Sequence, residues 1–419
     1  MSGFLSLRRE PFKSLYLLFC KFDILLRKPW WVIRNLLPSW RPRRSWPMSW
    51  CLQINEIRYY EAVSKAIGTN DNHPTAKELR LGPGVLGLYV DGVPQLVHDK
   101  LQFWARTAGV EPTRIPGYWM HQPGEPIVMG SKPAPGEKVV LYFHGGGYVI
   151  HSAHPDSPTS YIARSVVQHC AAAGANIRRI FNLEYRLSSH DPYPRENPFP
   201  AALLDALAGY AYLINDVGFL SSDIVIAGDS AGGNLALALT RYLLEMQAHD
   251  EIPAEQKLKP PFAMILLSPW ADVSNSYCAY PRSSVFTNAR SDFLIVPSKL
   301  HDGTYKVDYE LRAYSGVHGI AFAETNEYVS PGSAAFKDED ISFRGFPPTY
   351  ITSGSGEILL DQIRALVRRM QRDVGGNLIY YEADDAIHDF IGFPWQEPQR
   401  TTTLKNIGKW MSELLSKSP

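Results

Sequence analysis

The pattern Gly-x-Ser-x-Gly at Gly228–Gly232 constrains the fold of this chain more than any other feature. It comes directly after the apolar run Ile224–Ala227 and directly before the helical pattern Gly233–Leu244. Between a strand and a helix, the two glycines allow a cramped turn that lifts the serine hydroxyl above a sheet. Unpaired N–H groups at the start of the helix favour developing negative charge there. We therefore expect Ser230 to be a nucleophile, and the alternative is a chance match in a glycine-rich loop.

A second glycine motif, His-Gly-Gly-Gly-Tyr at His144–Tyr148, follows the apolar run Val139–Phe143. Glycines let the backbone approach a substrate and turn its N–H groups inward, as an oxyanion hole requires. We expect Gly145 and Gly146 to supply two donors, and Ala231, after the nucleophile, to supply a third. A triple glycine can also cradle phosphate, but the Lys-Ser/Thr of a phosphate-binding loop does not follow.

A serine hydroxyl needs a general base, and the base needs an orienting acid. In a strand–Ser–helix fold of this kind the chain order is serine, acid, histidine. His388 follows the last apolar run, which ends at Tyr381, and no other histidine lies beyond His318. We expect His388 to be the base; a histidine in a surface loop is the alternative.

Apolar runs separated by helical stretches recur from Lys138 onward. Because these runs do not alternate with polar residues, they indicate strands buried on both faces of a parallel sheet. Such a sheet binds ligands at the carboxyl ends of its strands. The prediction is an α/β fold with a mostly parallel central sheet flanked by helices. The runs are Val139–Phe143, Arg179–Tyr185, Ile224–Ala227, Met264–Leu267, Thr349–Thr352 and Asn377–Tyr381.

The chain has 419 residues, enough for one large domain and an additional cap. Residues 1–130 carry no motif and are predicted to be an N-terminal extension and cap, with a helix at Asp99–Ala108. Residues 131–419 are predicted to form the catalytic domain. Within it, residues 273–346 are too long for a simple crossover and rich in aromatic side chains. We expect this excursion to shape the pocket.

The first 50 residues hold ten basic and two acidic side chains and five of the ten tryptophans, although the whole chain has a formal net charge of zero. Charged residues and Pro29 interrupt the apolar stretch Leu15–Leu37, so a membrane-spanning helix is not expected. Basic residues mixed with Trp and Leu suit a helix lying on an anionic membrane. They suit equally well helices that pack over the active site as a cap, and the sequence leaves both hypotheses open.

Zero net charge gives no field that would attract nucleic acid, so no such partner is expected. No paired cysteine spacing suggests a metal site or a disulfide framework, and no Asn-x-Ser/Thr acceptor is present. We expect an intracellular protein that is cytoplasmic or peripherally attached to a membrane. The cysteines are Cys20, Cys51, Cys170 and Cys278.

The two glycine motifs together resemble the hormone-sensitive-lipase-like family of α/β-hydrolases. The resemblance covers about residues 138–415, although residues 188–198 are longer than is usual in the family. It implies a serine hydrolase, namely a short-acyl esterase, a lipase or an acetyl-ester hydrolase, with an N-terminal cap and no cofactor, which works through an acyl-enzyme. Further matching segments are Tyr185–Leu187, Phe199–Ala202, Ser330–Pro331 and Gly356–Asp361.

The third member of the triad departs from the family pattern, because Glu357 fills the usual aspartate position. In this fold the acid follows the strand before that of the histidine, and the run Thr349–Thr352 ends shortly before Glu357. Asp361 lies about one helical turn, or roughly 6 Å, further along. It suits the start of a helix, where a carboxylate complements the helix dipole. We expect Glu357 to orient His388; Asp384 and Asp385 are expected on the surface.

The basic N-terminal extension is similar to that of fungal family members, some of which act on steryl acetates or acetylated secondary metabolites. A binding protein is the main alternative, because the plant gibberellin receptor resembles this family but lacks the catalytic histidine. The presence of Ser230, His388 and an acid favours the enzyme. An amidase or peptidase is neither selected nor excluded, and the sequence does not name the substrate.

Overall fold

An eight-stranded sheet forms the centre of the computed structural model, which describes residues 10–67, 76, 78–122, 124, 128–250, 252–254, 257–299 and 308–417. The strand order is β1-β2-β4-β3-β5-β6-β7-β8. Strands β3 to β8 run parallel, whereas β1 and β2 add an antiparallel edge next to β4. The strands are β1 (Leu86–Val90), β2 (Ile115–His121), β3 (Lys138–Phe143), β4 (Ile177–Leu183), β5 (Ile224–Asp229), β6 (Ala263–Leu267), β7 (Thr349–Gly354) and β8 (Leu378–Ala383).

The predicted α/β class is confirmed, and each of the six apolar runs corresponds to a strand from β3 to β8. The sheet nevertheless begins at Leu86, well before the expected domain boundary at residue 130, because β1 and β2 belong to it. Gly117 permits this pairing: a Cβ there would lie 2.2 Å from the Phe181 ring of β4. A boundary at residue 130 would therefore divide the sheet.

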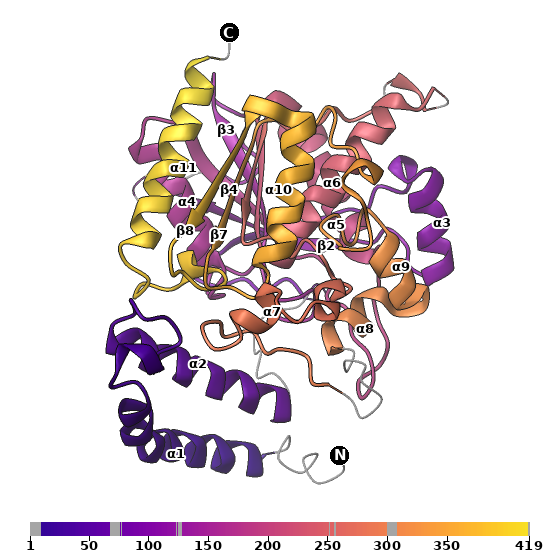
Figure 1. Cartoon of the computed structure of the whole chain (residues 1–419). Coiled ribbons are helices and arrows are strands. Elements are labelled where there is room, and N and C mark those ends of the chain that lie inside the picture. Colours follow the sequence, from indigo (N-terminus) through magenta and orange to yellow (C-terminus); the bar gives the residue numbers. More distant parts are fainter. Residues whose placement is uncertain are drawn as a thin grey trace.

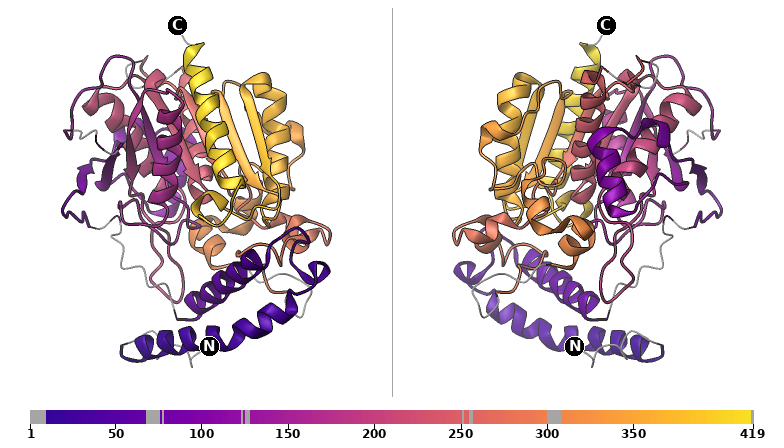
Figure 2. Two further views of the ribbon diagram at one scale, coloured as in Figure 1. Left: turned by 90° about the vertical axis from the view of Figure 1, so that its left-hand side faces the viewer. Right: turned by 90° about the vertical axis from the view of Figure 1, so that its right-hand side faces the viewer.

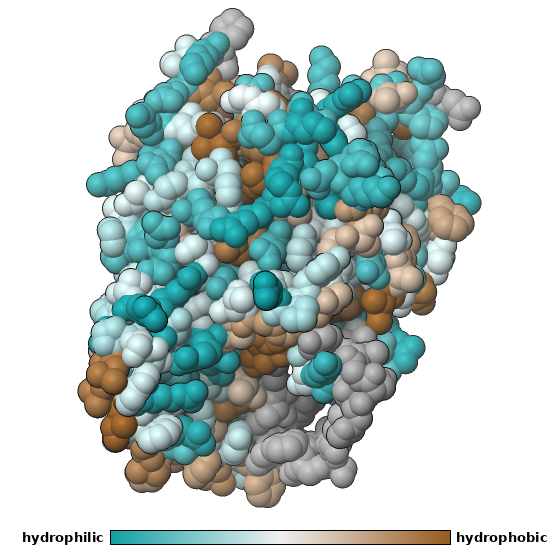
Figure 3. Space-filling view, in the orientation of Figure 1, coloured by the Kyte–Doolittle hydropathy of each residue, from teal (hydrophilic) through white to brown (hydrophobic). Residues whose placement is uncertain are grey.

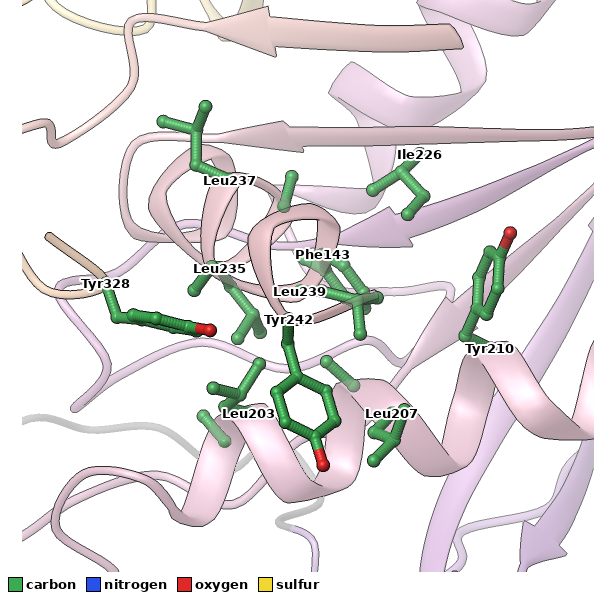
Figure 4. Packing of buried hydrophobic residues seen from close by; sticks show 14 of the residues in the cluster. Phe143, Leu203, Leu207, Tyr210, Ile226, Leu235, Leu237, Leu239, Tyr242 and Tyr328 are labelled. Carbon is green, nitrogen blue, oxygen red and sulfur yellow. The ribbon is translucent and has the colours of Figure 1, made fainter. Parts of the chain in front are cut away.

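Helices cover both faces of the sheet (Figures 1 and 2). Alternation along β3 sends Val140 and Tyr142 toward α4 and α11, and Leu141 and Phe143 toward α5 and α6. Figure 4 shows Phe143 among leucines of α5 and α6. Helix α10 packs on the same face as α5 and α6. These helices are α4 (Ser160–Ala172), α5 (Ala201–Tyr212), α6 (Ala231–Ala248), α10 (Leu360–Val374) and α11 (Gln399–Ser416), with α3 (Asp99–Ala108) at the side.

Two N-terminal helices, α1 (Phe12–Arg34) and α2 (Met48–Ile67), lie beyond the sheet, on the side of α7 (Ser284–Thr287) and α8 (Tyr309–Ser315) (Figure 1). Helix α9 (Gly319–Thr325) follows α8. Cys20 of α1 packs against Val63 of α2, so α2 lies between α1 and the body of the protein. Among the described residues, no helix combines the length and the apolar character needed to cross a bilayer.

Candidate active site

Ser230 occupies a sharp turn between β5 and α6, with the unusual backbone angles φ 49° and ψ −115°. The flanking glycines are required by contact: a Cβ at Gly228 would lie 2.4 Å from the Gly232 carbonyl carbon, and one at Gly232 would lie 1.9 Å from the Phe143 oxygen. The Ser230 N–H donates to the Leu267 carbonyl at 2.9 Å, which fixes the turn on β6. The strained turn presents the serine at the carboxyl end of the sheet, as a nucleophile requires.

The glycine motif after β3 faces this serine, but its donors differ from those expected. Gly145 donates its N–H to Asp229 Oδ2 at 2.9 Å, so this group is already used inside the protein. Gly146 and Gly147, with φ of 115° and 59°, line the cavity beside Ser230. This geometry does not favour the expected role of Gly145 in the oxyanion hole, because its N–H already donates a hydrogen bond to the buried carboxyl group of Asp229.

Glu357 and His388 lie side by side and are buried. Glu357 Oε2 is 3.4 Å from His388 Nδ1, within reach of a hydrogen bond from the ring. Asp361 instead accepts the Ser284 backbone N–H at 2.7 Å, in the first turn of α10. Asp385 lies in the loop of His388 but contacts the Ser45 hydroxyl. The structure thus brings His388 to Glu357 and gives Asp361 a structural role.

A cavity of about 390 Å³ joins these groups, since Ser230 and His388 both line it. Its wall includes Ile57 and Glu61 of α2, and none of the described residues 10–56 contributes. The excursion at residues 273–346 supplies a large share of the remaining wall, within its described part. Residues 300–307 lie outside the described residues. The excursion residues that line the cavity are Asn275, Tyr277, Val285, Phe293, Leu294, Ile295, Pro297, Asp308 and Glu310.

A family model described as the alpha/beta hydrolase fold matches residues 140–392, which include the serine turn, the glycine motif, Glu357 and His388. The chain belongs to this α/β-hydrolase family. It is 30% identical over 282 residues to an acetyl-hydrolase of Streptomyces hygroscopicus, covering 64% of this chain and 78% of the relative. It is 22% identical over 308 residues to steryl acetyl hydrolase 1 of Saccharomyces cerevisiae, covering 72% of this chain and 58% of the relative.

Solved esterase structures share the fold over most of this α/β-hydrolase chain. The esterase EstE5 has a TM-score of 0.55 and 26% identity, covering 88% of this chain and 99% of its own. A hormone-sensitive lipase from a metagenome library has a TM-score of 0.51 and 25% identity, covering 81% and 89%. The expected hormone-sensitive-lipase-like relationship is supported, and the chain is a hydrolase of the carboxylesterase type.

A second carboxylate, Asp389, contacts the His388 ring in this α/β-hydrolase. Asp389 Oδ2 lies 3.2 Å from His388 Nε2, the ring nitrogen that a triad directs at the serine. Among the described residues, the Ser230 hydroxyl makes no hydrogen bond to the protein, and its side chain remains at the cavity wall. The adjacency of Asp389 to His388 in the sequence was the available signal, but adjacency alone does not say which nitrogen is contacted.

The electrostatics of the α/β-hydrolase site follow from burial and from these carboxylates. Burial raises the pKa of Glu357 to about 7, against the contacts with His388 that lower it. Burial alone would lower the pKa of His388, but Asp389 and Glu357 outweigh it and hold that pKa well above its usual value. Burial, and then the charge of Asp389, raises the pKa of Asp229 to about 8. The site therefore favours a protonated ring at His388.

Proposed function

We propose that the chain hydrolyses short-acyl or acetyl esters of an apolar alcohol, such as a sterol or a secondary metabolite, through Ser230, His388 and Glu357. The observation that carries this proposal is that the serine on its strained turn and the buried His388–Glu357 pair border one cavity. A cavity of about 390 Å³ holds a small acyl group together with part of a larger alcohol.

Each residue has one chemical role in the proposed reaction. His388 Nε2 accepts the proton of the Ser230 hydroxyl as the oxygen attacks the ester carbonyl, and then gives this proton to the departing alcohol. Glu357 accepts a hydrogen bond from Nδ1 and stabilises the charged ring. A water molecule then attacks the acyl-enzyme by the same steps, and the carboxylic acid is released. The developing oxyanion accepts hydrogen bonds from the backbone N–H groups of Gly146, Gly147 and Ala231. In this proposal Gly147 replaces Gly145 as a donor.

The cavity wall and the relatives support the proposed substrate class. Ile57 of α2 and apolar side chains of the excursion line the cavity beside the serine, together with carboxylates such as Glu61 and Glu310, and the apolar part favours an apolar alcohol. Two relatives described above act on acetyl groups by their names, and one of them on steryl acetates. Purified protein should therefore cleave acetyl esters faster than long-chain acyl esters in a chain-length series, and screening of acetylated sterols and metabolites should identify the alcohol.

Replacement of the nucleophile tests the chemistry directly. Ser230→Ala should lower kcat on p-nitrophenyl acetate by about 10⁴-fold or more, because only this oxygen attacks the carbonyl. Ser222→Ala, an exposed serine at the opposite end of β5, serves as the control and should retain full activity. Circular dichroism should show both variants folded. More than a few per cent of wild-type activity in folded Ser230→Ala would remove Ser230 from the mechanism.

We also propose that the protein is intracellular and rests on anionic membranes through α1. The outward face of α1 is a continuous apolar stripe, while Cys20 and Ile24 are buried on its opposite face, where Cys20 packs against Val63 of α2. Figure 3 shows apolar residues gathered along the lower edge of the molecule, where α1 lies. The stripe consists of Phe12, Leu15, Leu18, Phe19, Phe22, Leu25, Leu26, Trp30 and Ile33, each more than half exposed.

Charge selects the bilayer as the occupant of this stripe. Helical periodicity places the exposed Lys21 and Arg34 at its two margins, where they meet anionic headgroups while the apolar side chains enter the membrane. Each basic residue near such a surface contributes about 1 kcal/mol of binding. A second copy of the chain would bring like charges together at both margins. The four buried, unpaired cysteines suit a reducing compartment.

A further inference from the structure

Three segments that are distant in the sequence meet around the Glu357–His388 pair. They are residues 288–293 after α7, 355–357 after β7 and 384–389 after β8. Asn288 ties the first to the second, donating to the carbonyl oxygens of Ser355 at 3.1 Å and Glu357 at 2.8 Å. Asp292 in the first segment accepts the Ile358 N–H at 2.7 Å. The position of the acid and the base thus depends on what holds these three segments.

Arg43, in the connection between α1 and α2, bridges two of these segments. Its Nη2 donates to the carbonyl oxygen of Ser355 and lies 3.3 Å from the Ser355 hydroxyl, two residues before Glu357. Its Nε lies 3.5 Å from Asp385 Oδ1, three residues before His388. One guanidinium therefore links the loop of the acid to the loop of the base.

Trp46 holds the histidine loop from the same side. Its Nε1 donates to the carbonyl oxygen of Asp385 at 2.9 Å, and the ring is 1% exposed. The ring belongs to the apolar cluster that contains Ala386 and Ile387, the two residues before His388. The neighbouring Ser45 hydroxyl contacts the Asp385 carboxylate. Packing and hydrogen bonding together fix the backbone that carries the base.

Arg58 of α2 holds the third segment. Its Nη1 donates to the carbonyl oxygen of Ala289 and lies 3.4 Å from that of Asp292. Asp292 is fully buried, and its charge faces both His388 and Glu357. Arg290, in the same segment, donates a hydrogen bond to the carbonyl oxygen of Trp40 in the N-terminal extension at 2.5 Å. The N-terminal extension therefore contacts all three of these segments around the acid–base pair.

We propose that Arg43, Trp46 and Arg58 are positioning residues for the catalytic acid and base, so that the N-terminal extension is part of the catalytic apparatus. The proposal rests on the function proposed above. The 3.4 Å separation between Glu357 and His388 leaves little room for a longer hydrogen bond. A displacement of about 1 Å can cost about a hundredfold in rate, so release of one loop is expected to lower turnover more than substrate binding.

The test uses full-length Arg43→Ala, Trp46→Phe and Arg58→Ala, with Arg43→Lys as the conservative variant. Trp46→Phe keeps an aromatic ring in the cluster but removes the N–H and makes the side chain smaller. Arg44→Ala is the control, since Arg44 is exposed and its loss changes the charge equally. The measurements are kcat and KM on p-nitrophenyl acetate, the pH profile of kcat/KM, the rate of covalent labelling by a fluorophosphonate, and the melting temperature.

Each positioning variant should lose about tenfold or more in kcat and in labelling rate with KM within about twofold. Arg43→Lys should restore part of the Arg43→Ala loss, and Arg44→Ala should match the wild type. Wild-type kcat in folded Arg43→Ala and Trp46→Phe would overturn the proposal. If Arg43→Ala does not fold, Trp46→Phe decides. A wild-type protein that neither hydrolyses nor labels would instead refute the proposed function.

Discussion

His388 has a carboxylate within reach of each ring nitrogen, Glu357 at Nδ1 and Asp389 at Nε2. Only the neutral ring can accept the proton of Ser230, and two carboxylates favour the charged ring. Other charged or titratable groups nearby are Asp292 and, beyond Asp389, Asp229 with its hydrogen-bonded Tyr142. A raised pKa of His388 means that activity is present above this pKa and lost as the pH falls through it.

Asp389→Asn should shift the acidic limb of the kcat/KM profile to lower pH by about one unit or more, because one of the charges that stabilise the ring is removed. Activity below neutral pH should rise accordingly. Asp384→Asn is the matched control, since Asp384 lies in the same loop and is exposed. Coinciding acidic limbs for Asp389→Asn and the wild type would show that Asp389 does not set the ionisation of the base.

The acid of the triad is decided by a pair of variants. Glu357→Gln should lower kcat by about a thousandfold or more, because the charged ring loses its partner. Asp361→Asn should leave kcat nearly unchanged and cost roughly 1–2 kcal/mol of stability, because its charge-assisted bond to the Ser284 N–H weakens. Kinetics with chemical denaturation separate the two effects. The reverse pattern would assign the acid to Asp361.

At this scale, sequence reasoning proposes Ser230, Glu357 and His388 for the triad but does not anticipate that the Gly145 N–H donates to Asp229. Three successive glycines carry no information about which N–H points at the substrate. The answer depends on Asp229, whose buried carboxylate takes the first N–H of the run and whose other oxygen accepts from Tyr142 at 2.6 Å. Such a partner across two strands cannot be inferred from the motif itself.

Helix α1 has two apolar faces: one packs on α2, and the other is exposed to solvent. Burial of a large apolar side chain is worth about 1.5–3 kcal/mol, so the open stripe is a substantial unused source of binding energy. Both hypotheses for residues 1–50 stay open: among the described residues, the cavity wall begins at Ile57 of α2, beyond this range, and the outer face of α1 is exposed.

A double variant, Phe22→Glu with Leu26→Glu, should bind vesicles that contain phosphatidylserine at least about tenfold more weakly than the wild type. The reason is that charges replace side chains that enter the bilayer. Hydrolysis of p-nitrophenyl acetate should stay within about twofold of the wild type. Phe103→Glu/Leu220→Glu is the control, since both side chains are as exposed but lie away from α1. Added salt should weaken wild-type binding.

Two other outcomes would contradict the membrane proposal. One is wild-type protein that stays off anionic vesicles in a sedimentation assay. The other is a dimer in solution that the α1 variant dissociates, which would assign the stripe to a second copy of the chain.

At the scale of the whole molecule, the sequence predicted the parallel part of the sheet and the helices that connect its strands. Continuous apolar runs indicate the buried strands, and helical stretches separate these runs. It did not predict β1 and β2. Gly87, Pro116 and Gly117 interrupt these strands, and glycine and proline are unfavourable in strand interiors. The hold of the N-terminal extension on the triad loops was also beyond sequence reasoning, since Arg43 and Ser355 are 312 positions apart.

The stacking of α1 on α2 has a kinetic consequence for any substrate dissolved in a membrane. Each helix layer is about 10 Å thick, so a protein resting on α1 holds its cavity roughly 20 Å from the lipid surface. An ester must then leave the lipid completely before it reaches Ser230. Turnover of membrane-dissolved esters would follow their rate of desorption, and a longer or more hydrophobic alcohol would be cleaved more slowly even where it fits the cavity better.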